Sequence, residues 1–298
     1  MESLRDIRQE IKSTKATQQI MLTMKMISSA RIRKAQQMML DGRPFAHKMA
    51  EMIDSLRKDI QAPDSELRKN SAYRYFDNTD TDKNSVMLIL ITADKGLCGS
   101  FNANVLRETL KWLRANEEKE KYVFIVGKKG RDFLRRLKIP RLHIVGELIG
   151  IFPKASYAHA TIIKDKILQI GTEKNISAVH IIYNDFKSMA SQKLVSKDFL
   201  PFDFDEIKGD QDISNITFEP SMMEVFLVLI PRYLGATLYS VLLESQAAEL
   251  AARMNAMESA SKNAGEIVDT LSVKLNKVRQ ATITSELTEI VSGANALN

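Results

Sequence analysis

The chain has 298 residues, of which 44% are hydrophobic and 27% are charged. These proportions are typical of a folded globular protein and exclude a wholly disordered or fibrous chain. The formal net charge of +6 suggests acidic partners but does not by itself indicate nucleic acid. Because Cys98 is the single cysteine, an intrachain disulfide and a multi-cysteine metal site are also excluded.

Residues 1–60 predict a long N-terminal helix that takes part in a coiled coil. Apolar residues recur at steps of three and four, although polar residues such as Thr14, Gln18 and Ser28 interrupt the pattern. Between residues 11 and 40 the segment has six Lys or Arg residues and no acid, which suggests an anionic partner surface. The predicted apolar face consists of Leu4, Ile7, Ile11, Ile20, Met24, Ile27, Phe45, Met49, Met52, Leu56 and Ile60.

Residues 70–205 predict an α/β domain. Short apolar runs at 86–92, 122–126, 142–145 and 178–183 are typical of buried strands, and helical spacing separates each run from the next. Such alternation predicts a parallel sheet in a Rossmann-like layered sandwich. The poorly patterned residues 206–231 are interpreted as a connector, or foot.

The turn Thr92–Asn102 follows the first predicted strand, where a Rossmann unit would hold a nucleotide. It matches neither G-x-G-x-x-G nor G-x-x-x-x-G-K-[ST]. Phosphate binding at a helix N-terminus is one interpretation, but a tight strand-to-helix turn is favoured. The four histidines and the paired carboxylates also lack catalytic or metal-ligand spacing, so we expect no catalytic residue, metal or cofactor.

Residues 232–298 predict a C-terminal coiled-coil helix. Small or apolar residues alternate at steps of four and three over ten steps, broken only by a serine, which predicts a left-handed supercoil with the N-terminal helix, running antiparallel to it. These positions are Leu243, Ala247, Leu250, Met254, Met257, Ser261, Ala264, Val268, Leu271, Leu275 and Val278.

The C-terminal helix is expected to be longer than its partner, which leaves its last turns unpaired. The apolar pattern shifts by five residues after Val278 and resumes at Ile283, Leu287 and Ile290. These three side chains would face water, and an exposed apolar stripe is typical of a binding surface. We therefore expect another chain to enclose this end, which is called the apolar tip below.

Four segments resemble the gamma subunit of F-type ATP synthase, and they are spread over both ends and the centre of the chain, so the resemblance spans essentially its whole length. Ser13–Gln36 resembles the N-terminal signature of that family, and Thr92–Asn102 resembles the turn after its first sheet strand. Ala251–Ala264 and Asn276–Ala294 resemble its C-terminal signature. The resemblance implies an antiparallel coiled coil with an inserted Rossmann-like domain that binds no nucleotide.

The resemblance also implies a function and partners. The family's gamma subunit is a central rotor stalk that couples transmembrane proton flow to ATP synthesis or hydrolysis at the beta subunits and performs no bond chemistry itself. The implied partners are three alpha subunits, three beta subunits, the epsilon subunit and the c-subunit ring. Association with the membrane would be through these partners only, at the cytoplasmic face of a bacterial inner membrane.

The resemblance assigns contacts to particular residues. It places Arg279, Gln280 and Thr284 against a loop of the beta subunits, and Met24 and Lys25 near acidic loops of the same subunits. Two other functions remain as alternatives: a basic coiled-coil scaffold for nucleic acid or signalling proteins, and a nucleotide-dependent α/β enzyme. The first conflicts with the long terminal matches, and the second with the missing phosphate motifs.

Overall fold

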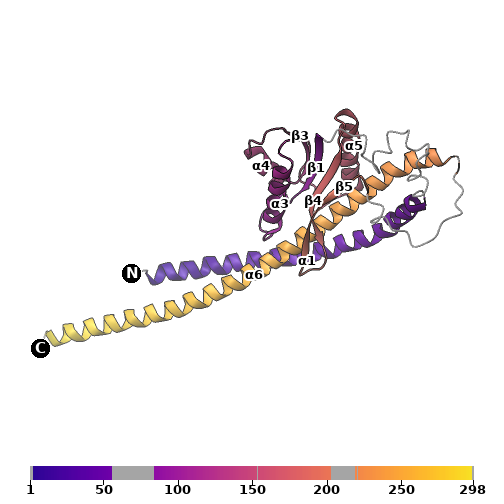
Figure 1. Ribbon diagram of the computed structural model, residues 1–298. Coiled ribbons are helices and arrows are strands. Elements are labelled where there is room, and N and C mark those ends of the chain that lie inside the picture. The colour runs from indigo at the N-terminus through magenta and orange to yellow at the C-terminus, as the bar shows by residue number, and fades with distance from the viewer. Residues whose placement is uncertain (1–2, 56–83, 153, 203–218, 220, 297–298) are drawn as a thin grey trace. The chain divides into compact units, whose positions relative to one another are not determined.

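The computed structural model describes residues 3–55, 84–152, 154–202, 219 and 221–296 (Figure 1). The chain forms two compact units, one of residues 30–252 and one of residues 1–29 with 253–298. Two long helices, α1 (Leu4–Ser55) and α6 (Met222–Ala296), contribute to both units. Residues 56–60 of the predicted N-terminal helix and residues 206–218 and 220 of the predicted connector lie outside the described residues.

The larger unit contains a five-stranded sheet in the order β3-β2-β1-β4-β5. Four strands are parallel: β1 (Ser85–Ile91), β2 (Glu120–Val126), β3 (Leu142–Leu148) and β4 (Ala178–Phe186). The helices between them are α3 (Phe101–Ala115), α4 (Lys128–Arg136) and α5 (Tyr157–Glu173). The predicted fold class, two long terminal helices with an inserted Rossmann-like domain, is confirmed.

A fifth strand, β5 (Gln192–Leu200), was not predicted. It pairs antiparallel with β4, so the prediction of a wholly parallel sheet is wrong. Only five residues, 187–191, separate the two strands, which is long enough for a hairpin but too short for the crossover that a parallel pair requires. Charged and hydroxyl side chains such as Lys197 and Ser196 reduce the apolar signal of this strand at the sheet edge.

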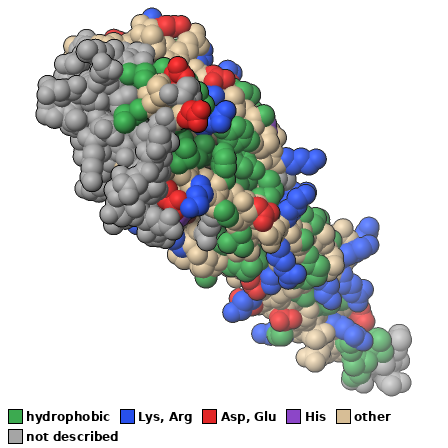
Figure 2. Space-filling view, turned by 90° about the vertical axis from the view of Figure 1, so that its right-hand side faces the viewer, with side chains coloured by type: hydrophobic (Ala, Val, Ile, Leu, Met, Phe, Trp, Pro, Cys, Tyr) green, Lys and Arg blue, Asp and Glu red, His purple; other side chains and the backbone are tan. Residues whose placement is uncertain are grey.

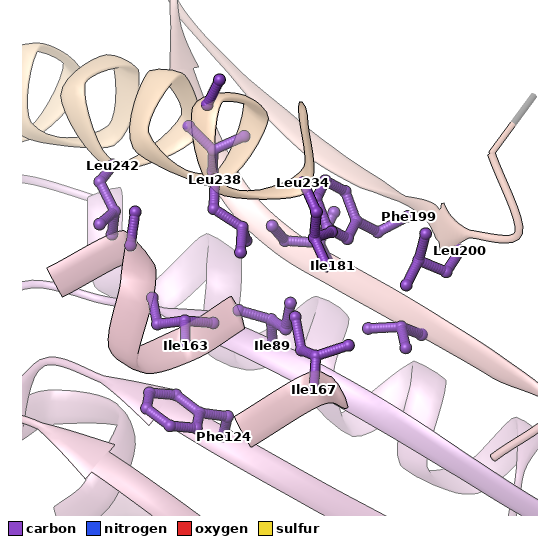
Figure 3. Close-up of a cluster of buried hydrophobic side chains, with 14 of the residues drawn as sticks. Ile89, Phe124, Ile163, Ile167, Ile181, Phe199, Leu200, Leu234, Leu238 and Leu242 are labelled. Atoms are coloured by element: carbon purple, nitrogen blue, oxygen red, sulfur yellow. The ribbon is translucent and has the colours of Figure 1, made fainter. Parts of the chain in front are cut away.

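The hydrophobic core occupies both faces of the sheet. Every side chain from Met87 to Ile91 on β1 is fully buried, as a central strand of a sheet covered on both sides requires. One face packs against α3 and α4. The other face packs against α5 and α6, where Leu234, Leu238 and Leu242 of α6 lie over the sheet residues (Figure 3).

Helix α6 begins at Met222, ten residues before the predicted start at residue 232. The proline at position 231 lies inside the helix, although proline removes a backbone hydrogen bond and usually bends or ends a helix. Phe226, Ile230 and Leu234 on either side of it are completely buried, so packing outweighs this cost. Leu227, four positions earlier, whose carbonyl has no amide hydrogen at position 231 to accept, lies on the exposed side of the helix.

One helix among the described residues, α6, contains a stretch long and apolar enough to cross a membrane by length and composition alone. Half of that stretch is buried inside the structure, and the core helix of a protein without membrane spans passes the same test. The burial of Leu234, Leu238 and Leu242 against the sheet assigns this apolar stretch to the core.

Candidate functional site: a two-helix coil with an unpaired end

The smaller unit is a coil of two antiparallel helices. Lys25 on α1 forms an ion pair with Glu258 on α6. Gln18, two turns earlier on α1, donates a side-chain hydrogen bond to the carbonyl of Ser261 and lies against Gly265. Residue numbers therefore fall along α1 as they rise along α6, which defines an antiparallel pair.

The seam of α6 in this coil follows the predicted heptad positions. Met257, Ser261, Ala264 and Val268 are buried. Farther toward the C-terminus the side chains at the same spacing are half-buried, and the series ends at Thr282. The burial thus follows alternate steps of four and three through residue 282, which is typical of coiled-coil packing.

The seam of α1 follows the prediction at Leu4, Ile7 and Ile11 and differs from it farther along the helix. Ile20 and Ile27, which the apolar spacing placed on the packed face, are 60% and 47% exposed. The buried and half-buried residues instead recur at steps of three and four through the polar residues that interrupted the apolar pattern. The series at this spacing is Leu4, Ile7, Ile11, Thr14, Gln18, Met21, Lys25 and Ser28, and Leu22, Met24 and Ser29 beside it are also half-buried.

The polar seam is explained by what lies opposite. Gly265 has no side chain, and an added Cβ atom there would lie 3.0 Å from Nε2 of Gln18. The small residues Ser261 and Ala264 are buried beside it. A glutamine on α1 thus occupies space that small residues on α6 leave free, so helix spacing rather than apolarity decides which α1 residues pack.

Lys25 has an internal partner in this coil. Its Nζ lies 2.6 Å from Oε1 of Glu258, and the two side chains are 34% and 57% exposed. Met24 is half-buried next to it. The positive charge of Lys25 is therefore already paired within the chain, a feature that no single-helix pattern could reveal.

Helix α6 continues beyond the end of α1. Lys25 lies opposite Glu258, and Gln18, seven residues earlier on α1, lies opposite Gly265, seven residues later on α6. Continued at the same register, the first residue of α1, Leu4, lies opposite residue 279. The last turns of α6, up to Ala296, have no α1 residue beside them. The expected unpaired end is therefore present.

The remaining predicted site residues lie where this unpaired end begins. Arg279, Gln280 and Thr284 are all exposed, and the Thr284 hydroxyl donates a hydrogen bond to the Gln280 carbonyl within the helix. In the apolar tip the exposed fractions are 46% for Ile283, 58% for Leu287 and 67% for Ile290. The structure thus brings the polar trio and the apolar tip together on α6, apart from Met24 and Lys25 in the α1 seam.

Apolar side chains are also exposed along the paired part of the coil, some of them at positions that the apolar spacing placed on the packed face. Ile20, Met26 and Ile27 on α1 and Ile267 and Val273 on α6 are exposed. Figure 2 shows exposed hydrophobic side chains (green) beside projecting Lys and Arg side chains (blue) on one face of the surface. Both the coil and its tip therefore present apolar surface of the kind that partners cover.

The turn after β1 is held by its own side chains. Oδ1 of Asp94 accepts hydrogen bonds from the backbone amides of Lys128, at the start of α4, and Gly150. Asn102 accepts a hydrogen bond from the amide of Ala93. Gly127 has φ +93°, and a Cβ atom there would collide with the carbonyl of Thr92, so only glycine fits.

Helix α6 covers this turn on one side. Ala93, Cys98 and Phe101 are buried in one cluster with Ala248 of α6. Rossmann-type folds bind ligands at the carboxyl ends of the central strands, and small α6 side chains pack there instead. The side chains of the turn thus serve packing and backbone hydrogen bonding, which agrees with its interpretation as a strand-to-helix turn.

The ATP synthase family model matches residues 3–297 of the chain. The chain is 52% identical to the ATP synthase gamma chain of Elusimicrobium minutum (strain Pei191), and the match covers all of both chains. It is 36% identical to the ATP synthase gamma chain of Chlorobium phaeobacteroides, over all of this chain and 99% of that protein.

Solved structures show a similar fold. A chain of the central stalk and c-ring of Tetrahymena thermophila mitochondrial ATP synthase is 28% identical, with a TM-score of 0.58 over 81% of this chain and 99% of that chain. A chain of the Euglena gracilis mitochondrial ATP synthase has a TM-score of 0.66 over 99% and 94% of the two chains, and at 20% identity it supports the fold alone. Because the family model and the relatives match along the whole length of the chain, the chain belongs to the ATP synthase gamma chain family.

Proposed function

We propose that this chain is the central rotor stalk of an F-type ATP synthase. It couples transmembrane proton flow to ATP synthesis or hydrolysis at the beta subunits by rotating inside a ring of alpha and beta subunits. The observation that carries this proposal is the coil in which α6 extends past Leu4 of α1 and ends in the exposed apolar tip. A shaft end that turns inside a bearing needs such a surface, since apolar side chains left in water favour enclosure.

Specific contacts follow from the exposure of the site residues. Ile283, Leu287 and Ile290 are proposed to turn inside the enclosing ring, because they are exposed apolar side chains that lie beyond the paired part of the coil. Arg279, Gln280 and Thr284 are proposed to meet a loop of the beta subunits, since their polar groups face outward where the pairing ends. Met24 and Lys25 are proposed to lie near acidic loops, with Glu258 competing for the Lys25 charge.

The chain is part of an ATPase complex, and we propose that it has no catalytic activity alone. The packing of Ala248 against Cys98 and Phe101 supports this, because it occupies the crevice where related sheets bind nucleotides. A titration of the isolated chain with ATP, followed by calorimetry, should give no binding heat. Saturable binding would instead favour the alternative of a nucleotide-dependent α/β enzyme.

The chain is a subunit of a membrane-associated ATP synthase complex. The individual partners are proposed to be three alpha subunits, three beta subunits, the epsilon subunit and the c-subunit ring. The complex is proposed to face the bacterial cytoplasm, with the chain held at the membrane by its partners. We assign residues 1–60 and 232–298 to the shaft helices, although Leu234, Leu238 and Leu242 also pack on the sheet. Residues 70–205 form the proposed α/β domain, and residues 206–231, which include the first ten residues of α6, form the proposed foot.

Co-purification from the native membrane tests this assignment. A tagged chain should bring down alpha and beta subunits, each in threefold excess, after detergent extraction. The variant Leu287→Asp should reduce this recovery, and Ser285→Asp, at an exposed polar position two residues away, is the matched control. Recovery of the chain without alpha and beta subunits would overturn the proposed function.

A further inference from the structure

Helix α4 carries an unusual concentration of positive charge. Its nine residues, Lys128–Arg136, include five Lys or Arg residues and one acid, and Lys138 lies two residues beyond its end. The whole chain has a net charge of +6, so this short helix supplies a large share of it. The proposed rotation inside the alpha/beta ring uses the coil and leaves this charge unexplained.

The charge is confined to one side of α4. At 100° per residue, the charged side chains cover one half of the helix and the apolar ones the other half. Leu134 and Gly130 are buried, with Leu134 in the core beneath α3 and α4. The exposed side therefore presents cations, and the apolar side is already covered by the sheet.

Part of the charge is neutralised within the chain. Arg131 donates two hydrogen bonds to Oδ1 of Asp132, which holds the pKa of that carboxyl below its usual value. Arg135 pairs with Glu147 at 3.0 Å. Across the described ranges of the chain, the remaining cations of α4 and its following turn form no ion pair. They are Lys128, Lys129, Arg136 and Lys138, called the α4 basic face below.

The chemistry of the surroundings selects one kind of partner. The backbone amide of Lys128, at the start of α4, already donates a hydrogen bond to Oδ1 of Asp94. This carboxylate takes the place that a phosphate group would have at the N-terminus of the helix. A membrane-binding helix inserts an apolar side, but the apolar side of α4 is buried in the sheet. Proteins that bind single-stranded nucleic acid combine basic residues with exposed aromatic rings on which the bases stack, whereas Trp112 and Phe133 nearby are packed on the core.

We propose that the α4 basic face is a docking surface for a carboxylate-rich surface of another protein in the complex. Lys128 and Arg136 are eight residues apart, about 12 Å along the helix, and they offer charges to acids about two helical turns apart on the partner. The ion-paired residues Arg131, Asp132, Arg135 and Glu147 lie among these cations and give the surface a mixed charge. A protein partner tolerates a mixed charge, whereas a polyanion disfavours it.

A photo-crosslink in the purified ATP synthase complex tests the proposal. The substitution Lys138→p-benzoylphenylalanine places the crosslinker at the edge of the face, and mass spectrometry identifies the attached peptide. The triple variant Lys128→Gln, Lys129→Gln and Arg136→Gln removes three cations. The matched control, Lys154→Gln, Lys174→Gln and Lys193→Gln, removes three exposed cations elsewhere on the α/β domain.

The expected result is a crosslink to a peptide rich in Asp and Glu. Its yield should fall about tenfold in the triple variant and with added salt, and should stay unchanged in the control. A crosslink to lipid, to nucleic acid or to a peptide without acids would overturn the proposal, as would no crosslink or an equal loss in the control. Recovery of alpha and beta subunits, measured in the same samples, reports separately on the proposed rotor function.

Discussion

The side-chain amide of Gln18 on α1 donates a hydrogen bond to the backbone carbonyl of Ser261 on α6, with 3.3 Å between Nε2 and the oxygen. A polar residue at a coiled-coil seam lowers stability but favours one register, since a shifted pair leaves it without a partner. Gly265 provides the space that the glutamine needs. This pair therefore fixes the alignment of the two helices.

Replacing Gln18 with leucine should weaken this alignment. The variant Gln18→Leu should raise the free energy of unfolding by about 0.5–1 kcal/mol, because an apolar side chain enters the seam. It should also allow a slip of one heptad, which displaces the helices by about 10 Å. Spin labels at the exposed positions Lys15 and Asp269, in a Cys98→Ser background, measure that displacement. Gln19→Leu, at an exposed neighbouring position, is the control and should retain a single distance between the spin labels. If Gln18→Leu also gave a single distance, Gln18 would not set the register.

Reversing the charge of Lys25 separates its internal pair from an external partner. Lys25→Glu places two acids together and should lower the free energy of unfolding by about 0.5–1 kcal/mol. It should also disturb the ratio of ATP turnover to ion pumping in the complex. The double variant Lys25→Glu with Glu258→Lys restores the internal pair and should restore stability alone. Recovery of coupling as well would mean that Lys25 acts only within the coil.

A charge in the apolar tip should affect the complex more than the isolated chain. Leu287→Asp should change the free energy of unfolding by less than about 0.5 kcal/mol, since Leu287 is exposed in the chain. In the assembled complex the same variant should reduce coupled activity, because the carboxylate would be enclosed in an apolar bearing. Hydrogen exchange of residues 283–292 in the assembled complex gives the second readout, and solvent access equal to that of the isolated chain would contradict the bearing.

The pair of His180 on β4 and Asp198 on β5 should make stability depend on pH. Nδ1 of His180 lies 2.7 Å from Oδ1 of Asp198, and this hydrogen bond holds the pKa of Asp198 below its usual value of 3.8. The carboxylate therefore stabilises the fold above that value, and the contribution is lost as the pH falls through the lowered pKa. The Asp198 side chain is 72% exposed, so the contribution stays below about 1 kcal/mol.

Fluorescence of Trp112, the single tryptophan, reports the unfolding that tests this pair. Between about pH 5 and about pH 2.5 the natural chain should lose more free energy of unfolding than Asp198→Asn, which has no carboxylate to protonate. Asp269→Asn, at an exposed position in the coil, should behave like the natural chain. Equal pH profiles for all three would remove any role for the pair.

The two terminal helices differ in how well the sequence predicts their packing. On α6 the residues that fill the seam are mostly small or apolar, so their heptad spacing identified the buried face from Leu243 onward. On α1 the seam includes Thr14, Gln18 and Lys25, while apolar Ile20 and Ile27 face outward. Hydrophobic periodicity predicts the packed face only where the opposite helix leaves room for large apolar side chains. The sequence pattern of one helix does not show which side chains lie opposite it.

Some features depend on groups that are far apart in the sequence or have no apolar signal. The side chain of Lys121 is buried and donates hydrogen bonds to the carbonyls of Asn116, Glu117 and Lys119 beyond the end of α3. Burial lowers the pKa of this ammonium group. A lysine at the start of a strand is normally predicted to be exposed. The burial of Lys121 depends on the carbonyl groups of the turn before it, which the sequence pattern does not indicate.

The proposed rotor function requires that the chain turn inside the assembled ring of alpha and beta subunits, and this rotation can be measured. A bead attached at Lys193→Cys in a Cys98→Ser background, with the alpha and beta subunits fixed to a surface, reports the movement of the shaft; Lys193 is exposed on β5. ATP hydrolysis should turn the bead continuously in one direction. Hydrolysis at the normal rate with a stationary bead would contradict the proposed rotor function.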